Sequence, residues 1–202
     1  RLIGLLLTFN LCMQIVNGVL IYYFKYVTRM ESLFSVFNSC ILAEMIGLMM
    51  FPKVARRLER PKVYTLACSL VILGLGIILV GGFVAPHNVI IVALGSITLK
   101  LGSAFSLGIT TVSIADVIDY GELKFGTRNE SIICSAQTFL MKASQAVSGL
   151  FTGVGLSLVG YVPDVQQTPT AIFGIRVLMI GIPAVFVLLS YFIYRKYYKL
   201  KG

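Results

Sequence analysis

Residues 63–84 read VYTLACSLVILGLGIILVGGFV, an apolar run without a charged residue and with only small hydroxyl and thiol groups after its first tyrosine. A helix needs about 20 mainly apolar residues to cross a bilayer core of about 30 Å, and this run is long enough. A membrane-spanning strand would instead show about ten residues of alternating polarity. The stretch therefore predicts a transmembrane helix and an integral membrane protein of the all-α class.

Similar runs occupy most of the chain. Of its 202 residues, 57% are hydrophobic and 12% are charged, and the mean hydropathy of +0.91 excludes the soluble classes. The predicted spans cover residues 2–24, 32–51, 63–84, 88–115, 131–160 and 171–194. No break between them resembles a domain linker, so residues 1–202 are expected to form a single six-helix bundle. The first run is interpreted as a spanning helix rather than a signal peptide, and the four cysteines as packing residues.

The basic residues predict the orientation of the bundle. Lysine and arginine accumulate on the cytoplasmic side of short loops, and with both termini inside, only Lys25 and Arg29 fall in external loops. The formal charge of +9 is then a signal toward anionic lipid, which makes a nucleic-acid partner unnecessary. We expect a multi-pass protein of the plasma (inner) membrane with both ends cytoplasmic.

Three of the predicted spans carry polar residues along one face. The stripes are Asn10, Gln14 and Asn17 in the first span, Ser96, Lys100, Ser103 and Thr110 in the fourth, and Gln137, Thr138, Met141, Lys142 and Gln145 in the fifth. Single groups of this kind often bridge neighbouring helices, but three stripes together favour a hydrated cavity. The third and sixth spans lack such stripes and are expected at the periphery. Two three-helix units with this pattern suggest an internal repeat.

Two lysines lie deep in the predicted membrane region. Lys142 is about twelve residues, or roughly 18 Å, from the cytoplasmic end of its span, and Lys100 reaches a similar depth from outside. Glu44 is the acidic residue that the chain places inside a span, and one carboxylate does not easily serve two ammonium groups. This predicts a facing polypeptide segment that supplies acids. In the alternative, one lysine pairs with Glu44 and the other points into water.

Between the fourth and fifth spans, residues 115–142 read ADVIDYGELKFGTRNESIICSAQTFLMK. Acidic residues recur every three positions at Asp116, Asp119 and Glu122, and basic and acidic residues follow. A mixed-sign cluster at a cytoplasmic helix end can close a gate through ion pairs that open when the bundle moves. An ordinary solvated loop is the alternative.

This segment closely resembles the corresponding stretch of the glycoside, pentoside and hexuronide cation symporters, the melibiose permease-like branch of the major facilitator superfamily. The residues that match the family pattern are Asp116, Asp119, Tyr120, Gly121, Glu122, Arg128, Glu130, Ser131, Gln137, Thr138 and Lys142. Weaker similarity continues through LVGYVPDVQQTP to the basic tail RKYYKLKG. The resemblance implies that the chain is the C-terminal half, with 3+3 helices, of a twelve-helix transporter.

What the family does supplies further expectations. The resemblance implies symport of a sugar or glycoside with Na⁺ or H⁺ by alternating access, with no enzymatic activity, no resident metal and no cofactor. Lys142 would face the acidic cation site of the N-terminal half. The expected substrate-binding residues are Gln137, Thr138, Asn10, Gln14, Asn17 and Lys100. The expected cytoplasmic gate consists of Asp116, Asp119, Tyr120, Glu122, Arg128 and Glu130.

Two other function classes are compatible with parts of the sequence. A membrane-embedded, magnesium-dependent prenyl transferase could use Asp116, Asp119 and Glu122 to hold a diphosphate, although no second Asp-rich motif completes such a site. A purely structural membrane subunit would have no use for deep lysines. On the transporter interpretation, residues 1–202 alone transport nothing, because one bundle cannot enclose a substrate.

Overall fold

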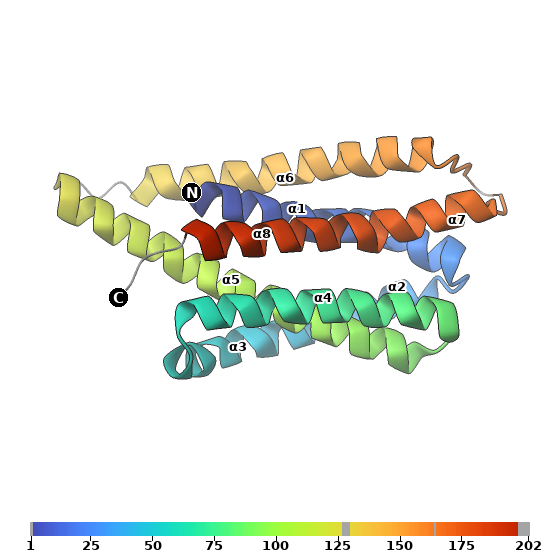
Figure 1. Ribbon diagram of the computed structural model, residues 1–202, viewed down its shortest axis with the longest axis horizontal. Coiled ribbons are helices and arrows are strands. Elements are labelled where there is room, and N and C mark those ends of the chain that lie inside the picture. Colours follow the sequence, from blue (N-terminus) through green and yellow to red (C-terminus); the bar gives the residue numbers. More distant parts are fainter. Residues whose placement is uncertain (1, 127–129, 164, 198–202) are drawn as a thin grey trace.

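The structure is a computed structural model, and it describes residues 2–126, 130–163 and 165–197. The helices run along a common axis (Figure 1). They are α1 (Leu2–Tyr22), η1 (Tyr23–Val27), α2 (Ser32–Ser39), α3 (Ile41–Arg57), α4 (Arg60–Val84), α5 (Val89–Phe125), α6 (Glu130–Leu158), α7 (Pro169–Arg176), η2 (Val177–Gly181) and α8 (Ile182–Tyr197). The described chain is helical with turns and no strands, which confirms the all-α class.

Within the described residues, five segments are long and apolar enough to cross a membrane: Leu7–Val27, Ser32–Arg57, Arg60–Val84, Val89–Lys124 and Pro169–Arg195. The helix α6 is not among them, although its 29 residues exceed the bilayer core at about 1.5 Å per residue. Its many hydroxyl and amide side chains lower its hydropathy. Five clearly apolar helices make this a multi-pass membrane protein.

Three helices differ from the ranges predicted from sequence. The segment 32–51 breaks at Cys40, where ψ is 2°. Asn38 and Ser39 each donate a side-chain hydrogen bond to the carbonyl four residues earlier, at 3.0 and 2.9 Å, and such bonds bend helices. The helix α3 continues through Pro52 to Arg57. The helix α5 extends to Phe125, where Gly126 ends it in the left-handed conformation at φ 68°, which glycine adopts without steric cost.

The packing of the helices follows two three-helix units. If α1, α2/α3 and α4 form one unit and α5, α6 and α7/α8 the other, equivalent pairs make equivalent contacts. The helix α1 packs on α6 and α8, and α5 packs on α3 and α4. The third helices of the two units, α4 and α8, contact each other. The first helix of each unit therefore packs on the second and third helices of the other unit, which agrees with the internal repeat expected from the polar stripes.

The two ends of the bundle differ in charge. In Figure 1, α1 begins, α8 ends and α3 leads into α4 at the same end. This end carries Lys53, Arg56, Arg57, Arg60, Lys62 and Arg195, and we call it the basic end. Lys25 and Arg29 lie at the opposite end, next to the loop that follows η1. The segregation is what the positive-inside rule describes, and the cytoplasmic location of the basic end is still a prediction.

The helices α4 and α5 approach each other backbone to backbone. A Cβ atom on Gly102 would lie 2.8 Å from the Ala67 carbonyl oxygen, and one on Gly74 would lie 2.7 Å from the Leu99 nitrogen. Small residues permit such contacts where no hydrophobic force between helices operates in lipid. By contrast, Gly149 and Gly153 of α6 have open space where a Cβ would be. Their spacing is therefore not used for packing within the described chain.

Candidate transport site

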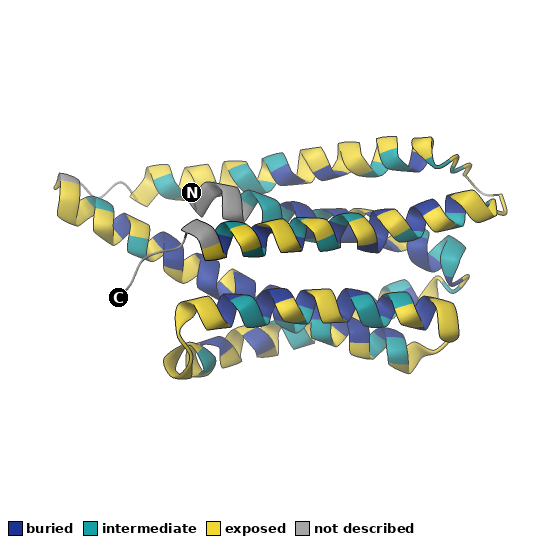
Figure 2. Cartoon of the chain, viewed as in Figure 1, coloured by how far each residue is buried: buried dark blue, intermediate teal, exposed yellow. Residues whose placement is uncertain are grey.

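The helix α6 presents a continuous polar stripe to the outside of the bundle. Its members recur every three or four residues and are all exposed, and we call them the α6 stripe: Ser131, Ser135, Thr138, Lys142, Gln145, Gly149 and Gly153. Residues at this spacing share one face of a helix. Figure 2 shows α6 as predominantly exposed along its length, whereas α4 alternates between buried and exposed positions.

The two other faces of α6 have different surroundings. Ser144 and Ser148 are buried against the bundle. Phe139 and Leu150 are 71% and 65% exposed and lie about a quarter turn from the α6 stripe at about 100° per residue. An apolar exposed edge suits acyl chains, but a stripe that contains an ammonium, amides and hydroxyls does not. The α6 stripe therefore needs water, a ligand or a polar partner.

The polar stripe of α1 adjoins the α6 stripe. The two helices run in the same direction (Figure 1) and touch where a Cβ on Gly18 would lie 2.9 Å from Thr152 Oγ1. Gly18 and Thr152 mark the line of contact between the two helices. Viewed along the shared helix direction, Asn17 is rotated by about 100° from Gly18 around α1, and Gly149 is rotated by about 60° from Thr152 around α6, in the opposite direction. Because the contact points face each other, these opposite rotations place both stripes on the same side of the helix pair.

The exposure of the α1 residues agrees with this placement. Asn17 is exposed, and Asn10 and Gln14 are half-buried. Five of the expected substrate or coupling residues thus lie along one shared face of α1 and α6. These five are Asn10, Gln14, Asn17, Thr138 and Lys142. Gln137, also expected to border the substrate, is half-buried on the side of α6 next to the bundle.

Lys100 has its counter-charge within the chain. Its Nζ donates to Glu44 Oε2 at 3.2 Å, and Ser103 Oγ donates to Glu44 Oε1 at 2.8 Å. The ammonium also lies 5.4 Å from the centroid of the Phe37 ring, next to the break between α2 and α3. The lysine and glutamate side chains are only 12% and 25% exposed. One of the two deep lysines thus pairs with Glu44, as in the alternative drawn from the sequence, and this pair joins α3 to α5.

The stripe on α5 accordingly faces the inside of the bundle. Ser96, Ser103 and Thr110 are buried, and Ser96 donates to the Val92 carbonyl at 2.6 Å. The polar residues of α5 therefore point toward neighbouring groups inside the bundle rather than into a hydrated cavity. This is the bridging role that single polar groups often have between transmembrane helices. The assignment of Lys100 to substrate binding stays a prediction.

Lys142 is the deep lysine that lacks a partner in the described part of the chain. Its side chain is exposed on the α6 stripe, and no carboxylate of the described residues lies within ion-pair distance of it. The inference of a facing acidic segment therefore rests on this single ammonium group, not on two. An unpaired charge at such depth costs several kcal/mol in lipid, on the order of 3 kcal/mol on insertion scales.

At the basic end, Asp116 binds an arginine that the sequence did not single out for this role. Arg60, in the first turn of α4, donates from both terminal nitrogens to the two Asp116 oxygens, with Nη2 to Oδ1 at 3.4 Å. In the sequence Arg60 contributes only to the charge that predicts orientation, and its separation of 56 residues from Asp116 leaves no local signal of the pairing. The pair ties the start of α4 to the final turns of α5.

The remaining members of the expected gate are at the surface. Asp119, Tyr120, Glu122 and Glu130 are exposed, and the Lys124 ammonium lies 5.7 Å from the centroid of the Tyr120 ring. Arg128 lies outside the described residues. The gate assignment of these residues stays a prediction.

The comparison with known proteins decides the family. The model of the MFS/sugar transport protein family matches residues 1–201. The chain belongs to this family. It is 30% identical over 93% of its length to an uncharacterized symporter, YjmB, of Bacillus subtilis (strain 168). It is 33% identical over 86% of its length to an isoprimeverose transporter of Lactiplantibacillus pentosus, and 26% identical over 91% to a lactose permease of Lactobacillus helveticus.

Membership in the MFS/sugar transport protein family confirms the resemblance seen in residues 115–142. The chain spans 40% of the length of YjmB, 36% of the isoprimeverose transporter and 28% of the lactose permease. These relatives are named as transporters, not enzymes. The magnesium-dependent enzyme is not supported: Arg60 engages Asp116, and the described residues hold no cluster of three or more potential metal ligands.

Proposed function

We propose that this chain is the C-terminal six-helix half of a sugar or glycoside transporter that couples uptake to Na⁺ or H⁺ by alternating access. The observation that carries the proposal is the shared polar face of α1 and α6. In a bundle whose other exposed faces are rich in large apolar side chains, this face places Asn17, Thr138 and Lys142 where lipid would be costly.

The partner in this proposal is the N-terminal half of the same transporter. Relatives more than twice as long as the chain have room for a second bundle of similar size. A second bundle against the α6 stripe would enclose a cavity and bring carboxylates to Lys142. Open space at Gly149 and Gly153 allows a facing helix to approach closely.

The chemistry of the shared face suits a carbohydrate. Asn10, Gln14 and Asn17 offer amide donors and acceptors, and Thr138 and Gln137 offer a hydroxyl and a further amide. Sugar hydroxyls both donate and accept, so amide and hydroxyl side chains match them. Lys142 supplies a positive charge whose interaction with acidic residues would change when a cation binds between them. In this proposal, Lys142 and the co-transported cation compete for the same acidic residues, and this competition couples the two transport events.

Uptake by the full-length transporter in proteoliposomes tests the proposal. A panel of labelled glycosides is offered with and without a sodium or proton gradient. Lys142→Leu should abolish gradient-driven uptake, a loss of about 100-fold or more, because removing one partner of a buried charge pair costs about 3–5 kcal/mol. Lys142→Arg keeps the charge and should retain part of the uptake.

Lys53→Leu is the matched control, because Lys53 is an exposed lysine at the basic end. It should leave coupled uptake within about twofold of the unmodified protein, since exposed charges contribute little. Gradient-driven uptake by Lys142→Leu at the unmodified rate would refute the coupling role of Lys142. A full-length protein that carries no glycoside under either gradient would refute the sugar assignment.

A further inference from the structure

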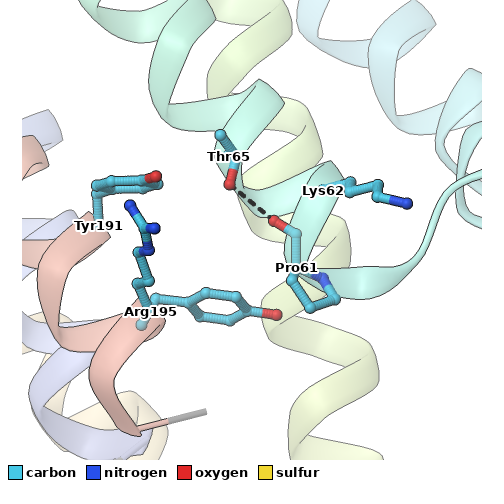
Figure 3. A pocket seen from close by; sticks show the side chains of 6 residues that line it. Pro61, Lys62, Thr65, Tyr191 and Arg195 are labelled. Atoms are coloured by element: carbon cyan, nitrogen blue, oxygen red, sulfur yellow. Dashed lines mark hydrogen bonds between the residues drawn. The ribbon is translucent and has the colours of Figure 1, made fainter. Parts of the chain in front are cut away.

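A cavity of about 330 Å³ lies at the basic end, where α4 begins and α8 ends (Figure 3). The residues that line it are Pro61, Lys62, Thr65, Tyr191, Tyr194 and Arg195. None of them belongs to the proposed transport site. The volume suits a lipid headgroup or a small anion, since pockets for drug-sized ligands begin at about 300 Å³.

The walls of the cavity are held by the contact between α4 and α8. The Tyr64 and Tyr194 rings stack with centroids 4.3 Å apart and planes inclined by 22°. The Tyr64 hydroxyl and Ser190 Oγ are hydrogen-bonded at 2.5 Å in the buried interior. This aromatic and polar contact fixes the spacing of the two helices, so the cavity is a formed feature of the bundle.

The chemistry of the cavity is that of an anion site. The Arg195 guanidinium lies next to the Tyr191 ring (Figure 3), and no carboxylate of the described residues pairs with it. A guanidinium presents a planar fork of donors that fits a phosphate. Lys62 lines the rim of the cavity. Its ammonium lies 3.3 Å from Glu59 Oε2, and the two side chains are 64% and 74% exposed. Such an exposed pair contributes little, so an anionic headgroup that enters from the membrane surface can compete with Glu59 for Lys62.

The position of the cavity indicates where that ligand comes from. The large exposed side chains of the neighbouring helices are apolar, namely Ile72, Leu73, Val80, Val185, Leu188, Leu189 and Phe192. Such surfaces face acyl chains. Tyrosines are enriched at the level of lipid headgroups, and Tyr191 and Tyr194 both line the cavity. The site therefore opens at the boundary between apolar lipid and the basic end.

We propose that this cavity binds the phosphate group of an anionic phospholipid, with Arg195 and Lys62 as its cationic ligands. The acyl chains extend along the exposed apolar residues of α4 and α8. Basic pockets between transmembrane helices are suited to anionic headgroups. A zwitterionic choline headgroup brings a positive charge toward the same cations and binds more weakly.

Native mass spectrometry of the full-length transporter tests this proposal with phosphatidylglycerol and phosphatidylcholine as probes. The unmodified protein should retain phosphatidylglycerol in preference to phosphatidylcholine. The double substitution Lys62→Gln with Arg195→Gln should weaken phosphatidylglycerol binding about 25-fold, because each basic residue near an anionic headgroup contributes about a fivefold change in affinity. The pair Lys62→Arg with Arg195→Lys should retain most of the binding.

The double substitution Arg56→Gln with Arg57→Gln is the matched control. It removes the same charge from the same end of the bundle, at exposed positions outside the cavity, and should change binding by less than about twofold. Thermal unfolding of each variant shows that the fold is intact. Equal losses in both double variants, or none in the cavity variant, would overturn the proposal. Full displacement of the lipid by millimolar inorganic phosphate would overturn the lipid assignment in favour of a soluble phosphate ligand.

Discussion

Individual charged side chains show how the bundle treats polar groups at depth. Lys100 is neutralised by Glu44 and ordered by Ser103 and Phe37, so its charge is a structural element that joins α3 to α5. Lys142 has no such partner in the described chain and lies on an exposed stripe. The two lysines look equivalent in the sequence, and only the packing of the helices separates a structural ion pair from a group available for coupling.

The Glu44 and Lys100 pair predicts a strong energetic coupling. Glu44→Gln leaves the Lys100 ammonium without a carboxylate and should destabilise the bundle, and Lys100→Met should do the same by leaving the carboxylate unpaired. The loss of unfolding free energy in the double variant should be smaller than the sum of the losses in the two single variants, by a coupling energy of about 1–3 kcal/mol. Reversible unfolding in mixed detergent micelles measures the cycle. Strictly additive effects would show that the pair contributes nothing beyond its separate contacts.

The sequence predicts the position of a residue well when its neighbours are close in the sequence, and poorly when its partner is far away in the sequence. The spacing of Asn10, Gln14 and Asn17 places them correctly on one face, because helix periodicity is a local property. The pairing of Arg60 with Asp116 was not predicted, since it depends on how α4 and α5 pack. The depth of Lys100 and Lys142 could be estimated from helix rise, but the presence of a partner could not.

At the scale of helices, the packing of α4 on α5 predicts a sharp contrast between two glycines. A methyl group on Gly102 would lie 2.8 Å from the Ala67 carbonyl oxygen, whereas one on Gly76 meets nothing within 4 Å. Gly102→Ala should therefore lower the free energy of unfolding by about 1–3 kcal/mol through overpacking. Gly76→Ala should be neutral or should stabilise by up to about 1 kcal/mol through helix propensity.

Thermal unfolding in a single detergent compares the two glycine variants directly. Both substitutions add one methyl group to α4 or α5, so differences in membrane insertion are small. Equal stability of the two variants would mean that α4 and α5 do not approach each other as closely as the structure places them.

The Arg60 and Asp116 pair joins two helices of the same bundle, which bears on the gate hypothesis. An ion pair can hold two halves of a transporter together only if its members come from different halves. We therefore expect this pair to brace α4 against α5, while Asp119 is exposed at the surface, where another segment could contact it.

Exchanging the charges of Arg60 and Asp116 tests whether this ion pair holds α4 against α5. Arg60→Gln and Asp116→Asn should each slow uptake by the full-length transporter a few-fold, since the side chains are 50% and 34% exposed and an exposed pair contributes at most about 1 kcal/mol. The double variant Arg60→Asp with Asp116→Arg should recover much of the rate in proteoliposome assays. A double variant that is slower than either single variant would show that each residue acts separately.

The sequence predicted the helical class well, and the ends of the helices less well. Long apolar runs fix where a chain crosses the membrane. The extension of α5 to Phe125 and the break at Cys40 depend on helix caps and on side-chain hydrogen bonds to the backbone, which are weak local signals. Continuation of α3 past Pro52 shows that one proline near a helix end need not stop it, because water and headgroups can satisfy the freed carbonyl.

For the whole molecule, the exposed surfaces divide into two kinds. The helices α4 and α8 expose large apolar side chains, as predicted for peripheral helices, and carry the cavity at the basic end. The helices α1 and α6 expose a shared polar face. The proposed role as one half of a transporter requires this asymmetry, because such a half has one side against water and one against lipid, whereas a bundle surrounded by lipid would be apolar on all sides.

Cysteine accessibility in the full-length transporter tests this division most directly. Single cysteines are placed at Thr138 and Gln145 on the α6 stripe and at Phe139 and Leu150 on its apolar edge, in a background from which all native cysteines have been removed. A membrane-impermeant thiol reagent is applied from each side of the membrane. The account predicts rapid labelling at Thr138 and Gln145, slowed by bound substrate, and labelling at least about tenfold slower at Phe139 and Leu150, because thiolates do not form in hydrocarbon. Labelling that is equally slow at all four positions, or faster on the apolar edge, would contradict it.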